Sequence, residues 1–241
     1  MKNYIKSWKI MLAIAGIVLG FAGAPVSVAF ADGGQKKAVS PSDSIYGMSY
    51  GDWSAAWWQY VLSIPIGANP VLDTTGANCG VGQSSGPVFF RVGAATTDPV
   101  PRTCAVSAGK ALFFPIINAE CSTVEPDPFH GDDGQELRTC VGGVMDGVDI
   151  KSLKVTVDKK KLSDLKSFRV QSPLFDFVMP SSNNYLGLNG VTAGSSVSDG
   201  YWIMLKPLSP GSHEIHFKAK ITSGIGAGFS QDVTYNLTVA D

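Results

Sequence analysis

The sequence lacks most of the patterns that mark a specific chemistry. Its four cysteines form no C-x-x-C pair, so zinc binding and thioredoxin-like redox chemistry are both poorly supported. It has no excess of positive charge, since 19 basic residues stand against 20 acidic ones, whereas nucleic-acid binding needs a broad basic face. After its first 31 residues it has no apolar run near the length of about 20 residues that crosses a bilayer. These absences leave no reaction class favoured by motif alone.

The first 31 residues have the layout of a secretory signal. Lys2, Lys6 and Lys9 precede an almost wholly apolar stretch from Ile10 to Ala24, and Ala29-Phe30-Ala31 supplies a small-x-small cleavage pattern. We therefore expect a signal peptide at 1–31 and a secreted or periplasmic product without membrane association. That product would carry 16 basic and 20 acidic residues, so we expect no nucleic-acid partner, and the sequence names no other partner.

The cysteines agree with export. Cys79, Cys104, Cys121 and Cys140 are even in number and widely spaced, as is typical of structural disulfides in an oxidising compartment. Four cysteines allow three connectivities, and sequence alone does not choose among them. We favour Cys79 with Cys104 and Cys121 with Cys140, because each pair closes a modest loop around one strand or turn.

One segment has the features of a helix. Ser49 and Asp52 have the spacing of a capping box, in which each side chain satisfies a free backbone amide. Large aromatic and aliphatic residues then recur at helical spacing from Trp53 to Val61, and Pro65 ends the pattern. The sequence therefore predicts a helix at about 51–63.

The rest of the chain has the pattern of short strands. Residues 32–45 are small and polar and predict a flexible lead-in, and 46–241 predict a single β-rich domain. Runs rich in Val, Phe, Ile and Thr predict eight strands, at 88–92, 111–117, 153–157, 168–171, 175–179, 200–205, 213–221 and 233–239. Ser209-Pro210-Gly211 predicts a hairpin-like turn between two of them. We expect an all-β fold, a β-sandwich or jelly roll, with the N-terminal helix packed on it.

Several strings of residues resemble those of an uncharacterised family of secreted bacterial proteins. They comprise Trp53-Ser54-Ala55-Ala56-Trp57-Trp58-Gln59-Tyr60, Ser63-Ile64-Pro65, Asn69-Pro70, Asp73, Cys79, Gly109-Lys110-Ala111-Leu112-Phe113-Phe114-Pro115-Ile116, Glu120-Cys121-Ser122 and Asp199-Gly200-Tyr201. The resemblance covers most of the chain, from about Tyr46 to Val239. It implies a shared secreted fold and carries over no reaction, cofactor or catalytic residue.

The densest group of polar residues is acidic. Six carboxylates and His130 lie within the 17 residues from Glu120 to Glu136, and Asp127, Asp132 and Asp133 are the candidate ligand-binding residues among them. Calcium needs several oxygen ligands of this kind, but the regular spacing of an EF-hand loop is absent. We favour a solvated acidic loop without a bound metal or other cofactor, with calcium as the alternative.

Two residues suggest different functions. Glu120 adjoins a cysteine and ends an apolar strand, so burial would raise its pKa and suit it to act as a catalytic acid. Trp58 lies on an aromatic-rich helix and could stack against a sugar, although such residues more often pack the helix on a sheet. We expect a non-catalytic binding or structural module. The alternative is a carbohydrate-directed hydrolase or lyase that uses acidic residues around Glu120.

Overall fold

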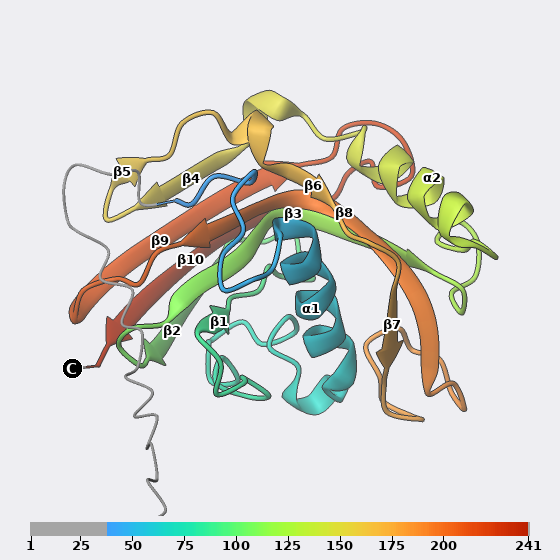
Figure 1. Ribbon diagram of the computed structural model, residues 1–241, viewed down its shortest axis with the longest axis horizontal. Helices are drawn as coiled ribbons and strands as arrows, with labels where there is room; N and C mark the ends of the chain where they lie inside the picture. The colour runs from blue at the N-terminus through green and yellow to red at the C-terminus, as the bar shows by residue number, and fades with distance from the viewer. Residues whose placement is uncertain (1–37, 241) are drawn as a thin grey trace, which may run out of the picture. The chain divides into compact units, whose positions relative to one another are not determined.

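The computed structural model describes residues 38–240, which belong to one compact unit (Figure 1). The expected signal peptide at 1–31, its cleavage site and residues 32–37 of the expected lead-in lie outside the described residues. At the start of the described residues, Ala38 forms a β-bridge with Leu205. The Val39 amide donates to the Met204 carbonyl at 2.8 Å, and Val39 and Ile45 are both buried.

The fold is mostly β-sheet, as expected from the sequence, and its strands form two mixed sheets. The central sheet has the order β1-β3-β8-β6 with β7 also paired to β8, and comprises β1 (Val88–Phe90), β3 (Ala111–Ser122), β6 (Arg169–Gln171), β7 (Phe175–Val178) and β8 (Ala193–Leu205). The outer sheet has the order β2-β10-β9-β4-β5, and comprises β2 (Val100–Val106), β4 (Lys154–Val157), β5 (Lys160–Lys161), β9 (Gly211–Lys220) and β10 (Ser230–Val239). All eight predicted strands are present in these sheets, with shifted ends.

Alternation along the strands of the central sheet decides what covers each face. On one face Trp202 stacks on Phe113 at 5.2 Å between ring centroids, and helix α1 (Tyr50–Ser63) covers both. On the other face Phe114 stacks on Phe217 of β9 at 5.1 Å, which joins the two sheets. Figure 1 shows α1 on the concave side of the long strands β3 and β8.

Helix α1 begins where local hydrogen bonds favour it. Ser49 caps it, accepting from the Asp52 amide at 3.1 Å, while the Asp52 carboxylate accepts from the Ser49 amide at 3.0 Å. Its aromatic residues face the central sheet, and Trp57 is only 2% exposed. The helix ends at Ser63, two residues before Pro65, whose ring cannot continue it.

A second helix, α2 (Gly134–Met145), corrects the expectation of one helix. Asp133 is its N-cap and accepts from the amides of Gln135 and Glu136. Leu137 and Val141 pack against Cys121 and Val197 on the face of the central sheet opposite to α1.

The short 3-10 turns are η1 (Ile66–Ala68), η2 (Ile150–Ser152) and η3 (Leu165–Phe168).

The predicted hairpin at 209–211 is wrong. β8 pairs with β3, β6 and β7, whereas β9 pairs with β4 and β10, so the connection passes from one sheet to the other. Pro207 and Pro210 favour an extended backbone at the residues before them, and an extended connection suits a crossing between layers. The alternation of apolar and polar residues along a strand predicts which face of the strand is buried. It does not predict which sheet the strand joins.

Both expected disulfides are confirmed. Cys79 pairs with Cys104 and Cys121 with Cys140. The first bond ties the segment after α1 to β2, and the second ties α2 to β3. Within residues 38–240, no helix combines the length and the apolar character needed to cross a membrane.

Candidate functional site

The strongest candidate site is a cavity between α1, β3, β10 and four connecting segments, which we call the helix pocket. Its volume is about 270 Å³, near the lower end of the range for small-molecule sites. Its lining comprises Trp57, Trp58, Val71, Gly93, Ala94, Ala95, Asn118, Tyr185, Phe229 and Gln231. None of these side chains is charged, and four are aromatic. The pocket is therefore shaped for a small neutral ligand with an apolar face.

Two side chains of the helix pocket hold buried hydrogen-bond donors without acceptors. Trp58 Nε1 and Asn118 Nδ2 are inaccessible to water and have no hydrogen-bond partner among the described residues. An unpaired buried N–H group costs about 1–3 kcal/mol, so such groups are uncommon in folded proteins. Both residues line the helix pocket, so two unpaired donors lie beside this cavity.

Local backbone structure brings Asn118 into the pocket. A β-bulge between Pro115 and Ile117 shifts the register of β3, which then places Asn118 opposite Gly200 of β8. A Cβ atom at Gly200 would lie 2.6 Å from Cβ of Asn118 and 2.9 Å from Nε1 of Trp202. Only glycine at this position leaves room for both side chains.

A buried arginine holds two walls of the pocket in place. Arg102 is 1% exposed and donates to the carbonyl oxygens of Val71 and Gly93, and to the Tyr235 hydroxyl at 2.9 Å. All of its hydrogen-bond acceptors among the described residues are neutral oxygens, so this cation is satisfied without a carboxylate. Gln231 adds a further bond, accepting from the Ala94 amide at 2.8 Å.

Glu120 lies two residues beyond Asn118 on the same face of β3 and belongs to a buried carboxyl pair. It is 4% exposed, accepts from the Ser196 hydroxyl, and shares a hydrogen bond with Glu125. Burial raises the pKa of Glu120 well above 4.5, and the charge of Glu125 raises it further. Burial also raises the pKa of Glu125, whose carboxylate accepts from the Ser122 hydroxyl at 2.8 Å. The pair therefore tends to retain one proton between its two members.

Tyr185 connects the carboxyl pair with the helix pocket. It lines the pocket, packs against Trp58 at 6.3 Å between ring centroids, and interacts electrostatically with Glu120 and Glu125. Burial, followed by these two carboxyl groups, raises the pKa of the Tyr185 hydroxyl to about 12. The tyrosine is therefore neutral at physiological pH and can only donate or accept a hydrogen bond.

The raised pKa of Glu120 predicts a specific pH dependence of stability. The folded protein holds a proton that the unfolded chain releases above pH 4.5, so this contribution is present below pH 4.5 and is lost as the pH rises through the folded pKa. Glu120→Gln keeps the shape of the side chain without its charge. We expect its unfolding free energy to rise relative to the parent between pH 4 and pH 8, measured by denaturant titration.

Asp127→Asn is the matched control for that experiment, because Asp127 is exposed. It should leave the pH profile close to that of the parent. A constant difference between Glu120→Gln and the parent at every pH would show that Glu120 does not hold a proton in the folded state.

The structure disperses the rest of the acidic segment. Asp133 caps α2, Asp132 is exposed with its carboxylate 3.1 Å from His130 Nε2, and Asp127 is exposed. Sequence reasoning grouped these residues with Glu120 by proximity along the chain, and missed Asn118 and Tyr185, which join Trp58 only through the fold. Within the described part of the chain, no group of three or more His, Cys, Asp or Glu side chains is placed to hold a metal ion.

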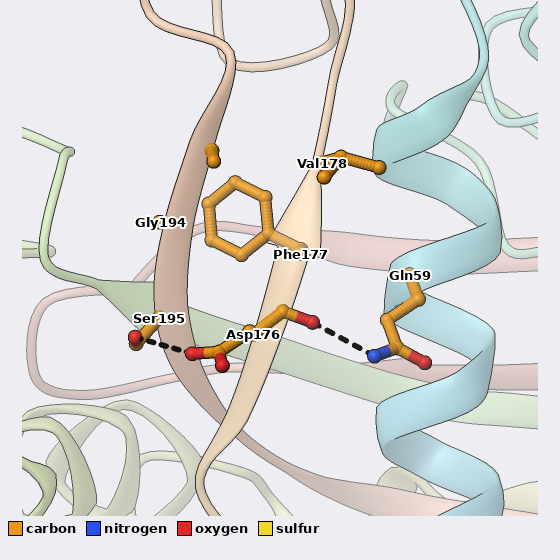
Figure 2. Close-up of a pocket in the computed structure, with 7 residues that line it drawn as sticks. Gln59, Asp176, Phe177, Val178, Gly194 and Ser195 are labelled. Atoms are coloured by element: carbon orange, nitrogen blue, oxygen red, sulfur yellow. Dashed lines mark hydrogen bonds between the residues drawn. The ribbon is translucent and has the colours of Figure 1, made fainter.

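A larger cavity of about 600 Å³ lies between β7, β8 and α1 (Figure 2). There the Gln59 amide donates to the Asp176 carbonyl at 2.7 Å, and the Ser195 hydroxyl donates to the Asp176 carboxylate at 2.7 Å. Phe177 packs beside Gly194, where a Cβ atom would lie 2.9 Å from its ring. Because these polar groups bond to one another, this cavity has fewer unpaired hydrogen-bonding groups for a ligand than the helix pocket has.

Two strings match G-x-S-x-G, the pattern of a hydrolase nucleophile, at 47–51 and 82–86. The Ser49 hydroxyl is engaged in the cap of α1. The Ser84 hydroxyl accepts from the Gly86 amide in a turn. Neither serine lies between a strand and a helix with a histidine as its partner, so neither forms a nucleophile elbow.

Comparisons with known proteins add little. No family model matches the chain, and no curated protein matches it in sequence. Among solved structures, the cysteine protease inhibitor EhICP2 from Entamoeba histolytica matches with a TM-score of 0.23 and 12% identity, covering 62% of this chain and 95% of that chain. A similarity of this extent carries no argument about function.

Proposed function

We propose that the protein is an exported β-sandwich module, a member of the secreted bacterial family that it resembles, which binds a small neutral sugar in the helix pocket without catalysis. The observation that carries this proposal is the pair of unpartnered donors, Trp58 Nε1 and Asn118 Nδ2, on two residues that line a cavity with aromatic walls. The two disulfides support a location outside the cytoplasm, because such bonds persist in oxidising compartments.

The chemistry of the pocket fits a sugar ring. The hydroxyl and ring oxygens of a sugar accept hydrogen bonds, and we propose that Trp58 and Asn118 turn their unpaired donors toward the cavity when the sugar binds. Its C–H faces are apolar and pack on aromatic side chains such as Trp58 and Tyr185. A charged ligand would find no counter-ion among the side chains that line the pocket.

The alternative is a carbohydrate-directed hydrolase or lyase, and the carboxyl pair is the observation that favours it. Two carboxyl groups with raised pKa values are a common source of acid catalysis. Glu120, however, is bonded to Ser196 and Glu125 and is not among the residues that line the helix pocket. Binding without turnover is therefore the better-supported function.

Removing one donor tests the proposal. Trp58→Phe keeps an aromatic ring in the pocket and deletes the Nε1–H group. We expect neutral monosaccharides to bind the parent protein, and the variant to bind about fivefold more weakly, because a lost hydrogen bond costs about 1 kcal/mol. Saturation-transfer NMR with a panel of methyl glycosides measures both, and calorimetry gives the affinities.

Trp53→Phe is the matched control. Trp53 lies on the same helix, donates to the Ile45 carbonyl at 3.1 Å, and does not line the pocket. It should lose some stability and keep its affinity. Equal affinities for the parent and Trp58→Phe would contradict the proposal. Turnover of chromogenic glycosides that Glu120→Gln abolishes would establish the hydrolase instead.

A further inference from the structure

A second concave surface lies on the outer sheet, on the face turned away from the central sheet. Its volume is about 460 Å³, and it crosses the ends of β4, β9 and β10 beside the start of β2. We call it the lysine groove. Its charged lining comprises Lys151, Lys154, Lys218, Lys220, Asp149 and Asp232.

The register of the outer sheet places two of these lysines side by side. Lys154 of β4 lies directly opposite Lys218 of β9, and Lys218 lies opposite Asp232 of β10. The flanking residues Val155 and Phe217 are buried, so the lysine side chains project to the outer face. Like charges directly opposite each other destabilise a sheet, so this lysine pair lowers the stability of the outer sheet. The fold itself does not need two lysines at these positions.

The acidic residues compensate only part of the positive charge. Lys218 lies 3.6 Å from Asp232, and Lys220 lies 3.7 Å from Asp149. Lys151 and Lys154 form no ion pair with another described residue. His216 also contacts Asp232, at 2.7 Å. The groove thus concentrates positive charge in a chain whose formal net charge is −1, and a concave site of one sign attracts anions.

We propose that the lysine groove binds an acidic saccharide, a sugar chain that carries carboxylate or sulfate groups. Lys151 and Lys154 would contact the anionic groups. Asp149 and Asp232, which lie between lysines in the groove, would accept hydrogen bonds from sugar hydroxyls. This inference does not depend on the helix pocket.

The mixture of signs favours a saccharide over a phosphate polymer. A phosphate chain offers closely spaced negative charges and few hydroxyl donors, so the carboxylates of Asp149 and Asp232 would repel it. An acidic saccharide supplies both an anion for each uncompensated lysine and donors for each carboxylate. The lysine ammonium is a compact point charge, which suits carboxylate and sulfate groups equally.

The experiment uses the full-length exported protein and two double variants with the same change in charge. Lys151→Gln with Lys154→Gln removes the uncompensated charges of the groove. Lys160→Gln with Lys161→Gln removes two exposed charges of β5, at the edge of the same sheet and outside the groove lining. The probes are oligogalacturonate, dextran sulfate, neutral dextran and inorganic polyphosphate, measured by calorimetry at low and at physiological salt.

We expect at least one of the two acidic saccharides to bind, with affinity that falls as salt rises, and neutral dextran not to bind at the groove. The groove variant should bind about tenfold more weakly, and the β5 variant within about twofold of the parent. The better of oligogalacturonate and dextran sulfate identifies the anionic group. Equal losses in the two variants, no binding of either acidic saccharide, or polyphosphate binding as tightly as the saccharide would each overturn the proposal.

Discussion

Trp57→Ala should lower the unfolding free energy by about 3–5 kcal/mol, the usual cost of deleting a large aromatic side chain from a core. Trp57 is 2% exposed, and its ring makes edge contacts with Trp58 at 5.1 Å and Trp202 at 5.4 Å. Its Nε1–H also donates to the Arg91 carbonyl at 2.8 Å. The truncation therefore opens a cavity between α1 and the central sheet and leaves a buried carbonyl without its donor. For a domain of this size the melting temperature should fall on the order of 10 °C.

Two further variants separate these effects. Trp57→Phe keeps most of the ring and removes the hydrogen bond, so it should cost about 1–3 kcal/mol. Gln59→Ala on the exposed face of α1 removes one bond to the Asp176 carbonyl and should cost about 1 kcal/mol. Chemical denaturation gives all three values. Because Trp57 also lines the helix pocket, a variant with unchanged stability and lost sugar binding would contradict the packing role.

Local patterns identified the elements whose signals are short in range. The expected bounds of α1 agree with those observed to within one residue. The two signals that predict it, the cap and the aromatic spacing, both lie in or directly before the helix. The burial and raised pKa expected for Glu120 also agree with the structure, since the apolar strand before it already indicated a buried position.

The elements that were missed had conflicting local signals. In α2, Leu137 and Val141 have helical spacing and Asp133 is a good N-cap, but Gly142 and Gly143 lower the helix propensity. In β2, a proline and a buried arginine interrupt the alternation of apolar residues. Pro101 is tolerated there because β2 is an edge strand, which sequence alone does not reveal.

The helix pocket could not be predicted from the sequence for a different reason. Trp58, Asn118 and Tyr185 come from three segments separated by some 60 residues each, and only the pairing of β3 with β8 and the path of the 180–192 connection bring them together. A single buried asparagine has no signal in a sequence. Its unpaired amide becomes informative only when its surroundings are known.

Removal of either disulfide should have an effect of similar size to that of Trp57→Ala. The bonds close loops of 25 and 19 residues, and in the chain-entropy model each such bond raises the unfolding free energy by about 3 kcal/mol. Full reduction should therefore lower stability by about 6 kcal/mol, a large part of the roughly 5–15 kcal/mol that is typical of a domain. Melting with and without reductant measures the total, and the double variants Cys79→Ser with Cys104→Ser and Cys121→Ser with Cys140→Ser divide it.

The two double variants should also differ in where the structure loosens. Cys121 and Cys140 tie α2 to β3 beside Leu137 and Val141, while the last turn of the helix is held by Val144 and Met145 in the main core. Loss of that bond should speed amide hydrogen exchange in α2 and leave α1 protected. Loss of the Cys79–Cys104 bond should instead speed exchange in the segment between α1 and β1. An unchanged melting temperature under reductant, or faster exchange in the same segments for both variants, would show that the bonds do not act as separate restraints.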